Sequence, residues 1–325
     1  MVKINMWQNQ GKKIEKKDNE WRRKQLGPIR PSGGDRQQAK NELGATSQDN
    51  VNKIIAELDS LVGLKSVKKL ITELQAFIEI QKLRQKEKLA YEPMVLHMIF
   101  KGSPGTGKTT VARIIGKLFK EMGVLSKGHI IEVERADLVG EYIGHTAKRT
   151  RDEIKKALGG IMFIDEAYSL ARGGEKDFGK EAIDAMVKAM EDNKDNLVLI
   201  LAGYKHEIEA FLETNPGLRS RFPIHITFPD YSTQELMEIA EMMLKKRQYC
   251  LTDEARDQLR TLIKIRAQRH INSGNARMVR NLIERAMRLQ AVRLVNAQLP
   301  KISKEELMTI TAEDLINAYD DLTED

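Results

Sequence analysis

The sequence predicts an α/β protein in which a parallel sheet, covered by helices on both faces, precedes a small all-helical domain. Three observations lead to this prediction. Short apolar runs alternate with helix-like segments between residues 95 and 228, which is typical of parallel strands joined by crossover helices. A phosphate-binding loop pattern stands between the first apolar run and the helix that follows it. After Pro229 the strand-like runs end and only helical patterns continue.

The individual elements follow from apolar spacing along the chain. Helical spacing opens the folded part at 51–61 and 65–84. Strands and helices then alternate, with strands expected at 95–100, 129–133, 160–164, 197–202 and 224–228, and helices at 108–121, 146–158, 178–192 and 205–213. Ser232 and Glu235 form a capping-box pattern that begins a helix ending near residue 248. Further helices are expected at about 253–271, 275–297 and 312–319.

Charge and cysteine content narrow the class of protein. The net charge of the 325 residues is +7. Residues 1–40 hold 11 Lys and Arg against 4 Asp and Glu, whereas the rest of the chain holds 43 of each sign. The folded part is therefore neutral, and nucleic acid is not its expected partner. The apolar runs are too short for a transmembrane segment, and the single cysteine, Cys250, suits a reducing cytoplasm.

Residues 1–50 are interpreted as a basic, disordered N-terminal arm or a docking arm. They are polar, contain glycine and proline breakers, and place Trp7 and Trp21 among lysines and arginines. Such a mixture could contact a membrane surface, nucleic acid or a protein, or could simply be solvated. The domains expected after it are a nucleotide-binding α/β domain at 51–229 and a helical lid domain at 230–325.

Residues 102–109 match the phosphate-loop pattern at every fixed position and lie between a predicted strand and a predicted helix. Glycines let successive backbone N–H groups converge on phosphate oxygens, and the helix N-terminus adds a partial positive charge. Lys108 is expected to reach the β- and γ-phosphates of ATP, and the Thr109 hydroxyl to bind Mg²⁺. The predicted nucleotide contacts in this loop are Gly102, Pro104, Gly105, Thr106, Gly107, Lys108, Thr109 and Thr110.

Asp165 and Glu166 follow a predicted buried strand, at the edge where α/β sheets bind ligands. Asp165 is expected to hold Mg²⁺ through water, and Glu166 to polarise the water that attacks the γ-phosphate. The alternative is an aspartate that caps a helix beside a solvated glutamate.

With these motifs the segment from about Leu58 to Asp320 resembles an AAA+ ATPase. The strings that carry the resemblance are GSPGTGKTTVARIIG, DLVGEYIGHT, IMFIDEAYSL, LILAGY, NPGLRSRF and GNARMVRN. Within that class the chain is most similar to the group that contains the red-type rubisco activase CbbX and stage V sporulation protein K, with the greater likeness to the latter. The fold this implies is a P-loop AAA+ sheet followed by an all-α lid.

The resemblance also implies roles for residues outside the two motifs. Val62 and Gly63 match the segment that packs on adenine, although a simple turn between helices would also explain them. Arg221 occupies the place of an arginine finger, with Arg219 as its neighbour; both could instead be solvated. Arg277 matches the sensor-2 arginine of the lid.

Two further features are the first sensor position, which has two interpretations, and an acidic helix face. Tyr204 stands where many AAA+ proteins have a small polar residue, and it serves either as a sensor or as a packed aromatic. Glu181, Asp184 and Glu191 share a predicted helix and are interpreted as a solvated face.

Tyr142, Ile143 and Gly144 match the trio that, in the family, projects into a central hexamer pore. An aromatic ring can grip an extended peptide without sequence-specific hydrogen bonds, and glycine allows the loop to move. The alternative is that Tyr142 and Ile143 are ordinary loop residues.

The resulting hypothesis is a ring-forming ATP hydrolase that uses Mg²⁺ and ATP to thread or remodel an unidentified protein client. The resemblance implies a homo-oligomer, a hexamer. A role in spore formation is implied by the resemblance alone. The alternatives are an AAA+ ATPase that remodels nucleic acid, and a nucleotide-gated scaffold with little turnover.

Overall fold

The computed structural model describes residues 48–90, 94–142, 144–172, 178–269, 274–298 and 301–324. Nearly all of them belong to one compact unit, Asn50–Asp325. The predicted N-terminal arm, with Trp7 and Trp21, lies outside the described residues except at its last positions, which begin a helix running from 48 to 59. Within the described ranges, no helix is both long enough and apolar enough to cross a membrane.

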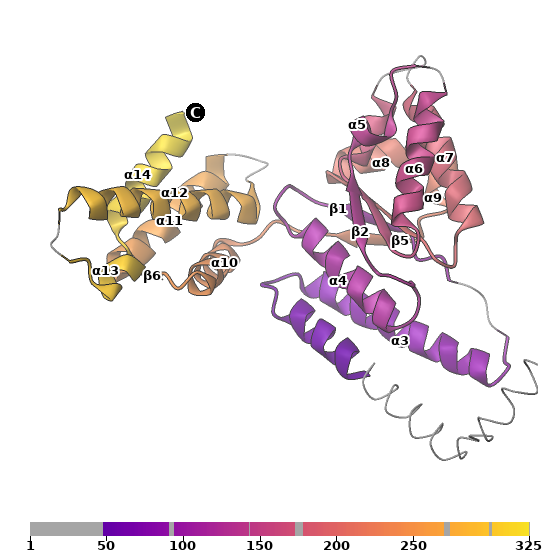
Figure 1. Ribbon diagram of the computed structural model, residues 1–325, viewed down its shortest axis with the longest axis horizontal. Helices are drawn as coiled ribbons and strands as arrows, with labels where there is room; N and C mark the ends of the chain where they lie inside the picture. The colour runs from indigo at the N-terminus through magenta and orange to yellow at the C-terminus, as the bar shows by residue number, and fades with distance from the viewer. Residues whose placement is uncertain are drawn as a thin grey trace, which may run out of the picture. The chain divides into compact units, whose positions relative to one another are not determined.

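The sheet has five parallel strands in the order β2-β3-β4-β1-β5 (Figure 1). They are β1 (Met98–Lys101), β2 (Ile130–Val133), β3 (Ile161–Ile164), β4 (Val198–Gly203) and β5 (Ile224–Thr227). Each predicted strand is present within one to three residues of its expected bounds. The largest difference is at β1, which begins at Met98 because the ladder starts there, with Met98 opposite Ile200 on one side and Ile224 on the other.

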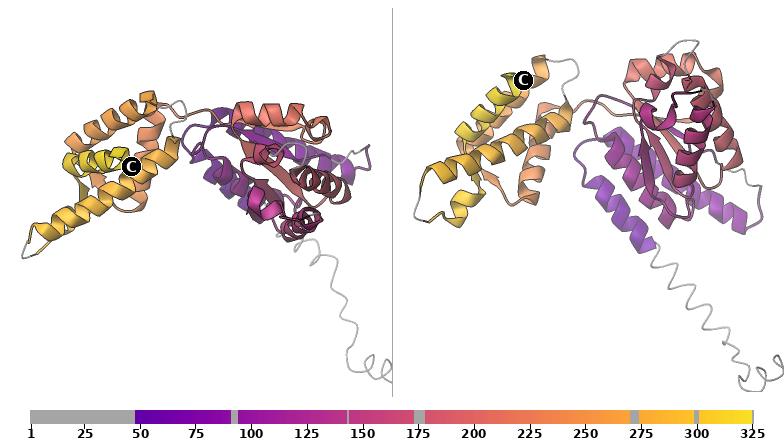
Figure 2. Two further views of the ribbon diagram at one scale, coloured as in Figure 1. Left: turned by 90° about the horizontal axis from the view of Figure 1, so that it is seen from above. Right: turned by 45° about the horizontal axis from the view of Figure 1, so that its top comes forward.

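Helices cover both faces of the sheet, as predicted (Figures 1 and 2). Strand residues alternate between two apolar clusters, so that Phe100 packs on one face and Ile99 on the other. The first face carries α3 (Lys65–Lys86), α4 (Lys108–Glu121) and the helix at 48–59. The second carries α6 (His145–Ala157), α7 (Gly179–Asp192) and α8 (Lys205–Glu213).

Between residues 98 and 228, three one-turn elements of the described structure were not predicted from the sequence; α13 (Lys304–Met308), in the C-terminal part below, was not predicted either. The three are α5 (Arg135–Leu138), η1 (Ala167–Ala171) and α9 (Pro216–Arg219). A single turn is too short to produce an apolar period, so spacing alone does not reveal it. Each begins within a few residues of the end of a strand or helix and completes a connection between larger elements.

The C-terminal part is helical, as predicted, and has its own apolar core. Its helices are α10 (Thr233–Lys246), α11 (Asp253–Arg269), α12 (Asn275–Asn296), α13 (Lys304–Met308) and α14 (Ala312–Glu324). Ser232 and Glu235 form the expected capping box at the start of α10. The last helix extends further than the predicted 312–319. A two-residue parallel pair, β6 (Cys250–Leu251) with β7 (Thr309–Ile310), was not anticipated because it is too short to show alternation.

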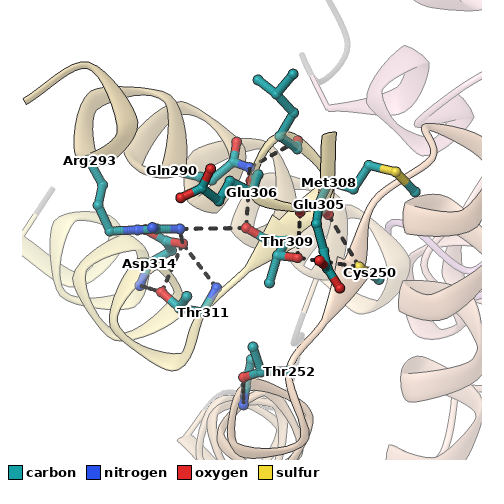
Figure 3. A network of polar contacts seen from close by, with 12 residues as sticks. Cys250, Thr252, Gln290, Arg293, Glu305, Glu306, Met308, Thr309, Thr311 and Asp314 are labelled. Carbon is teal, nitrogen blue, oxygen red and sulfur yellow. Dashed lines mark hydrogen bonds and ion pairs between the residues drawn. The ribbon is translucent and has the colours of Figure 1, made fainter. Parts of the chain in front are cut away.

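A polar network fastens α12 to the segment that joins α13 and α14 (Figure 3). The Arg293 guanidinium donates to both carboxylate oxygens of the buried Asp314, each at 2.9 Å. The side-chain amide of Gln290 donates to three backbone carbonyls, those of Glu306, Leu307 and Thr309. Burial alone would raise the pKa of Asp314, but hydrogen bonds from Arg293 and Thr311 lower it. These contacts join α12 to the start of α14 and to the segment before it.

His97 supplies an expected dependence of stability on pH. Its Nδ1 accepts the backbone N–H of Leu199 at 3.1 Å, and the ring is 2% exposed, so burial lowers the pKa to about 4. A proton added at Nδ1 would place two N–H donors opposite each other, so the hydrogen bond from the Leu199 amide would be lost. The pKa of His97 in the unfolded chain is near 6.5, so between about pH 4 and 6.5 the unfolded chain binds more protons than the folded one. The free energy of unfolding should therefore fall as the pH decreases through this window, by up to roughly 3 kcal/mol.

Urea unfolding of the wild type and of His97→Asn at several pH values between 7 and 4.5 would measure this effect. Asparagine keeps an acceptor near the Leu199 amide but does not titrate. The difference between the two slopes against pH should therefore isolate His97. Parallel slopes would contradict the assignment.

Candidate functional site

The phosphate loop connects the end of β1 to the first turn of α4. Gly105 and Gly107 both have positive φ, 74° and 95°, where an L side chain would be strained. A Cβ atom on Gly105 would also collide with the carbonyl oxygen of Gly274 and would lie 2.8 Å from the backbone nitrogen of Arg277. Glycine is therefore required for the tight curve that brings backbone amides toward a phosphate.

The polar side chains of the loop have distinct partners. The Lys108 ammonium donates to the carbonyl oxygens of Gly102 and Ser103, at 2.8 and 2.9 Å. The Thr106 hydroxyl is buried and donates to the Ser103 carbonyl at 2.8 Å, so it stabilises the loop itself. Thr106 can therefore contribute its backbone to a nucleotide, but its hydroxyl is already engaged.

Four charged groups from three segments act on the Lys108 ammonium. Burial lowers the pKa of Lys108, and the positive charge of Arg277 lowers it further, while the carboxylates of Asp165, Asp230 and Glu166 oppose the shift. The structure thus gathers three residues predicted for nucleotide chemistry, Asp165, Glu166 and Arg277, around the phosphate-loop lysine.

Thr109 and Asp165, the two predicted Mg²⁺ ligands, are both half-buried. Thr109 lies in the first turn of α4, whereas Asp165 follows the end of β3. A hydroxyl and a carboxylate are the oxygen ligands that Mg²⁺ prefers, so this donor set fits the ion. Thr110, the next residue of α4, is exposed.

Glu166 is held in a left-handed conformation, with φ of 46°, at the start of η1. Its carbonyl oxygen accepts the Ser169 amide at 2.7 Å, and its own amide donates to Asp165 Oδ1 at 3.0 Å. Glu166 is the N-cap residue of η1, and its own side chain makes no capping hydrogen bond. Strained residues of this kind cluster at functional sites, and here the strain places an exposed carboxylate at the edge of the sheet.

Tyr168 and Arg172 lie beside Glu166, and sequence reasoning missed them. Burial and the charge of Glu166 raise the pKa of Tyr168 to about 12. The Arg172 guanidinium stacks over the Tyr168 ring at 4.7 Å, and the Tyr204 ring is 6.2 Å away. Tyr204 thus packs against an aromatic neighbour and the apolar core, which favours the packed-aromatic interpretation of this residue.

Arg221 contacts groups of its own subunit. Its guanidinium is paired with Glu191 of α7 and donates to the Gly217 carbonyl at 2.9 Å. Glu191 is exposed, as expected for a solvated face, and the fold also brings it to an arginine 30 residues away. Arg219, at the end of α9, is exposed.

The segment predicted to pack on adenine is in contact with the start of α10. Val62 packs against the apolar core of the C-terminal part. Gly63 has φ of 65°, and a Cβ atom there would collide with the Glu235 carboxylate and lie 3.4 Å from the Tyr231 ring. The close approach explains why glycine stands at this position.

Arg277 lies in the first turn of α12 and is exposed. The neighbouring Ala276 amide donates to the Gly105 carbonyl at 3.2 Å, so the first turn of α12 touches the phosphate loop. The structure thus brings Arg277 to the loop, as its predicted role requires.

The predicted pore loop joins α5 to α6. Tyr142 is 65% exposed, and its ring meets His145 edge-on at 5.4 Å. Gly144 has φ of 79° and begins α6, with open space around its Cα. Ile143 lies outside the described residues. An exposed aromatic on a short connection is available for contact with another molecule, which the ordinary-loop alternative does not require.

Comparison with known proteins agrees with this geometry. The model of the AAA family, ATPases associated with various cellular activities, matches residues 98–230, and the AAA lid domain model matches residues 232–325. Stage V sporulation protein K of Bacillus subtilis (strain 168) is 54% identical over 286 residues, covering 86% of this chain and 88% of the relative. Protein CbbX of Cereibacter sphaeroides is 48% identical over 266 residues, covering 81% and 85%.

A chloroplastic ribulose bisphosphate carboxylase/oxygenase activase of Cyanidioschyzon merolae is 44% identical over 284 residues, covering 87% of this chain and 97% of the relative. Among solved structures, the Thermotoga maritima RuvB Holliday junction branch migration motor aligns with a TM-score of 0.55 at 22% identity, covering 82% of this chain and 72% of that one. At this identity the likeness concerns the fold alone.

A parallel five-stranded sheet with a phosphate loop, an acidic pair beside it and a helical lid defines a P-loop ATPase. The chain belongs to the AAA+ family of ATPases, and is related to stage V sporulation protein K and CbbX. Its activity is ATP hydrolysis.

Proposed function

We propose that this ATPase assembles into a homo-oligomeric ring, a hexamer, and uses Mg²⁺ and ATP to thread or remodel a protein client. The observation that carries the proposal is the position of Arg221. The charges of Asp165, Arg277, Asp230 and Glu166 act on Lys108, and the Arg221 guanidinium is paired with Glu191 and donates to the Gly217 carbonyl. Because this ion pair lies at the surface, Arg221 can exchange it for a phosphate group in a neighbour's site.

In the proposed mechanism the residues of one chain prepare the reaction. The loop amides and Lys108 bind the phosphates, Val62 and Gly63 border the base, and Arg277 contacts the γ-phosphate from the lid. Glu166 accepts a proton from the attacking water, and Arg221 of the next subunit stabilises charge on the transferred group. Thr109, and Asp165 through water, would hold Mg²⁺, which supplies further stabilisation of phosphate charge.

The proposed domains are the arm at 1–50, the nucleotide-binding domain at 51–229 and the lid at 230–325. The boundary near Pro229 is supported by the separate apolar core of the lid and by the two family models that meet there. A cytoplasmic location is also part of the proposal, on the basis of the single cysteine.

A protein client is favoured by the exposure of Tyr142 and by the neutral charge of residues 41–325. The trio Tyr142, Ile143 and Gly144 would grip an extended peptide. Likeness to a sporulation protein supports a process in spore formation, while likeness to rubisco activases supports protein remodelling as the general activity. The basic arm supports the second candidate, remodelling of nucleic acid.

The test is ATPase activity per mole of chain, measured against protein concentration with Mg²⁺ and saturating ATP. We expect a rise from near zero to a plateau, because a subunit without its neighbour's Arg221 has an incomplete site. A flat rate from a protein that sizes as a monomer would overturn the shared site. Stimulation by DNA that disappears at high salt would favour the nucleic-acid candidate.

A further inference from the structure

Three consecutive carbonyl oxygens of the phosphate loop accept hydrogen bonds from the C-terminal part, namely from Tyr231, just before α10, and from the first two residues of α12. We name these three contacts the loop clasp. They are, donor first, Asn275 Nδ2 to Pro104 at 3.4 Å, the Ala276 amide to Gly105 at 3.2 Å, and the Tyr231 hydroxyl to Thr106 at 3.2 Å. The catalytic roles proposed above make no use of Asn275 or Tyr231.

Asn275 is the centre of the loop clasp. The residue is 1% exposed and has φ of 45°, a conformation that asparagine tolerates better than most residues. Its Oδ1 accepts the Tyr231 amide at 3.0 Å, and its Nδ2 donates to Asp230 Oδ1 at 3.0 Å as well as to Pro104. Both N–H donors and the acceptor of this amide are thus in use, which fixes its orientation.

Because of the geometry of the peptide bond, these contacts also fix the direction of the loop amides that bind phosphate. In a trans peptide the carbonyl of one residue and the N–H of the next point in opposite directions. Holding the carbonyls of Pro104, Gly105 and Thr106 toward the lid therefore holds the amides of Gly105, Thr106 and Gly107 away from it. These are amides that the motif assigns to phosphate oxygens.

We propose that the loop clasp orients the phosphate-binding amides, so that Asn275 and Tyr231 are positioning residues for the polyphosphate. A loop fixed in its binding conformation loses less freedom when the ligand arrives, and affinity rises accordingly. Because Asn275 and Ala276 belong to α12, polyphosphate binding and the position of the lid are linked, each favouring the other.

The test compares affinities for ADP and AMP, measured on the full chain by competition with a fluorescent ADP analogue. Tyr231→Phe keeps the ring but removes the hydroxyl, and Asn275→Gly removes the amide but allows the positive φ. We expect each variant to weaken ADP binding roughly five- to tenfold, as for the loss of one or two hydrogen bonds, with AMP binding nearly unchanged. Tyr249→Phe, a half-buried tyrosine of the lid, is the matched control and should bind both as the wild type does.

A second pair of variants tests the part played by Asp230. Asn275→Asp places two carboxylates together and should weaken ADP binding. Adding Asp230→Asn exchanges the two groups and restores a hydrogen bond between them, so it should recover part of the affinity. The bond to Pro104 stays lost, because a carboxylate at position 275 cannot donate. If the double variant binds no better than Asn275→Asp, the proposed part of Asp230 is wrong.

Two outcomes would overturn the loop clasp as a positioning device. One is unchanged ADP affinity in both Tyr231→Phe and Asn275→Gly. The other is an equal loss for ADP and AMP, which would show that the variants disturb the base or the fold and not the phosphate amides. These affinities are measured without turnover and do not depend on ring assembly, so they separate this inference from the proposed shared site.

Discussion

Replacing Glu166 by glutamine is expected to lower kcat for ATP hydrolysis by roughly 10²- to 10⁴-fold, the usual contribution of a general base. Glutamine has the same shape but cannot accept the proton of the attacking water. Glu166 is exposed at the end of β3, and its left-handed backbone is set by the Ser169 and Asp165 contacts, so the substitution should leave the turn intact. ATP affinity should be retained.

The measurement is steady-state turnover together with equilibrium binding of ATP. Glu213→Gln, which removes the same charge from an exposed position at the end of α8, is the matched control and should keep wild-type turnover. Unchanged turnover in Glu166→Gln would refute its role as the base. Loss of ATP binding would instead mean that Glu166 belongs to the nucleotide-binding contacts.

Replacing Arg221 by alanine is expected to lower kcat by roughly 10³- to 10⁵-fold, as for other arginine fingers, with ATP binding retained. The removed guanidinium would have stabilised charge on the phosphoryl group in the neighbouring site. Arg219→Ala should have a smaller effect, because Arg219 is the neighbour of the finger position in the resemblance and is exposed on α9.

Mixing the two inactive variants distinguishes a shared site from a self-sufficient one. An Arg221→Ala chain retains Glu166, and a Glu166→Gln chain retains Arg221, so adjacent copies of the two can form a complete site. Activity should therefore return when the variants are co-assembled, although each is inactive alone. No recovery from rings shown to contain both chains would mean that Arg221 acts within its own subunit.

Arg221→Ala also removes the ion pair with Glu191, so the effect of the substitution on stability must be considered. In the described structure the Glu191 carboxylate holds the guanidinium, and the pair is partly exposed, so it contributes little to stability. The activity lost in Arg221→Ala should thus not arise from unfolding. Equal thermal midpoints of the variant and the wild type would confirm this.

The sequence by itself determined the order of the elements and the two motifs of the site. The phosphate loop, Asp165 and Glu166 are recognisable because their chemistry depends on neighbours within a few residues and on one strand or helix beside them. The alternation of apolar runs was likewise sufficient for the sheet, since each strand is short and followed by a helix, and the three central strands, β3, β4 and β1, are buried. One-turn elements such as α5 and α9 produced no periodic signal.

Only the tertiary structure decided which distant groups meet. The sequence does not show that the exposed Glu191 pairs with Arg221, 30 residues away, and nothing in the local sequence of Asn275 indicates that its amide reaches Pro104, 171 residues away. The pairing of Asp314 with Arg293, 21 residues away, is a similar case. A hydrogen bond depends on distance and direction in space, and these are set by how the helices and strands pack, whereas a sequence motif records only separation along the chain.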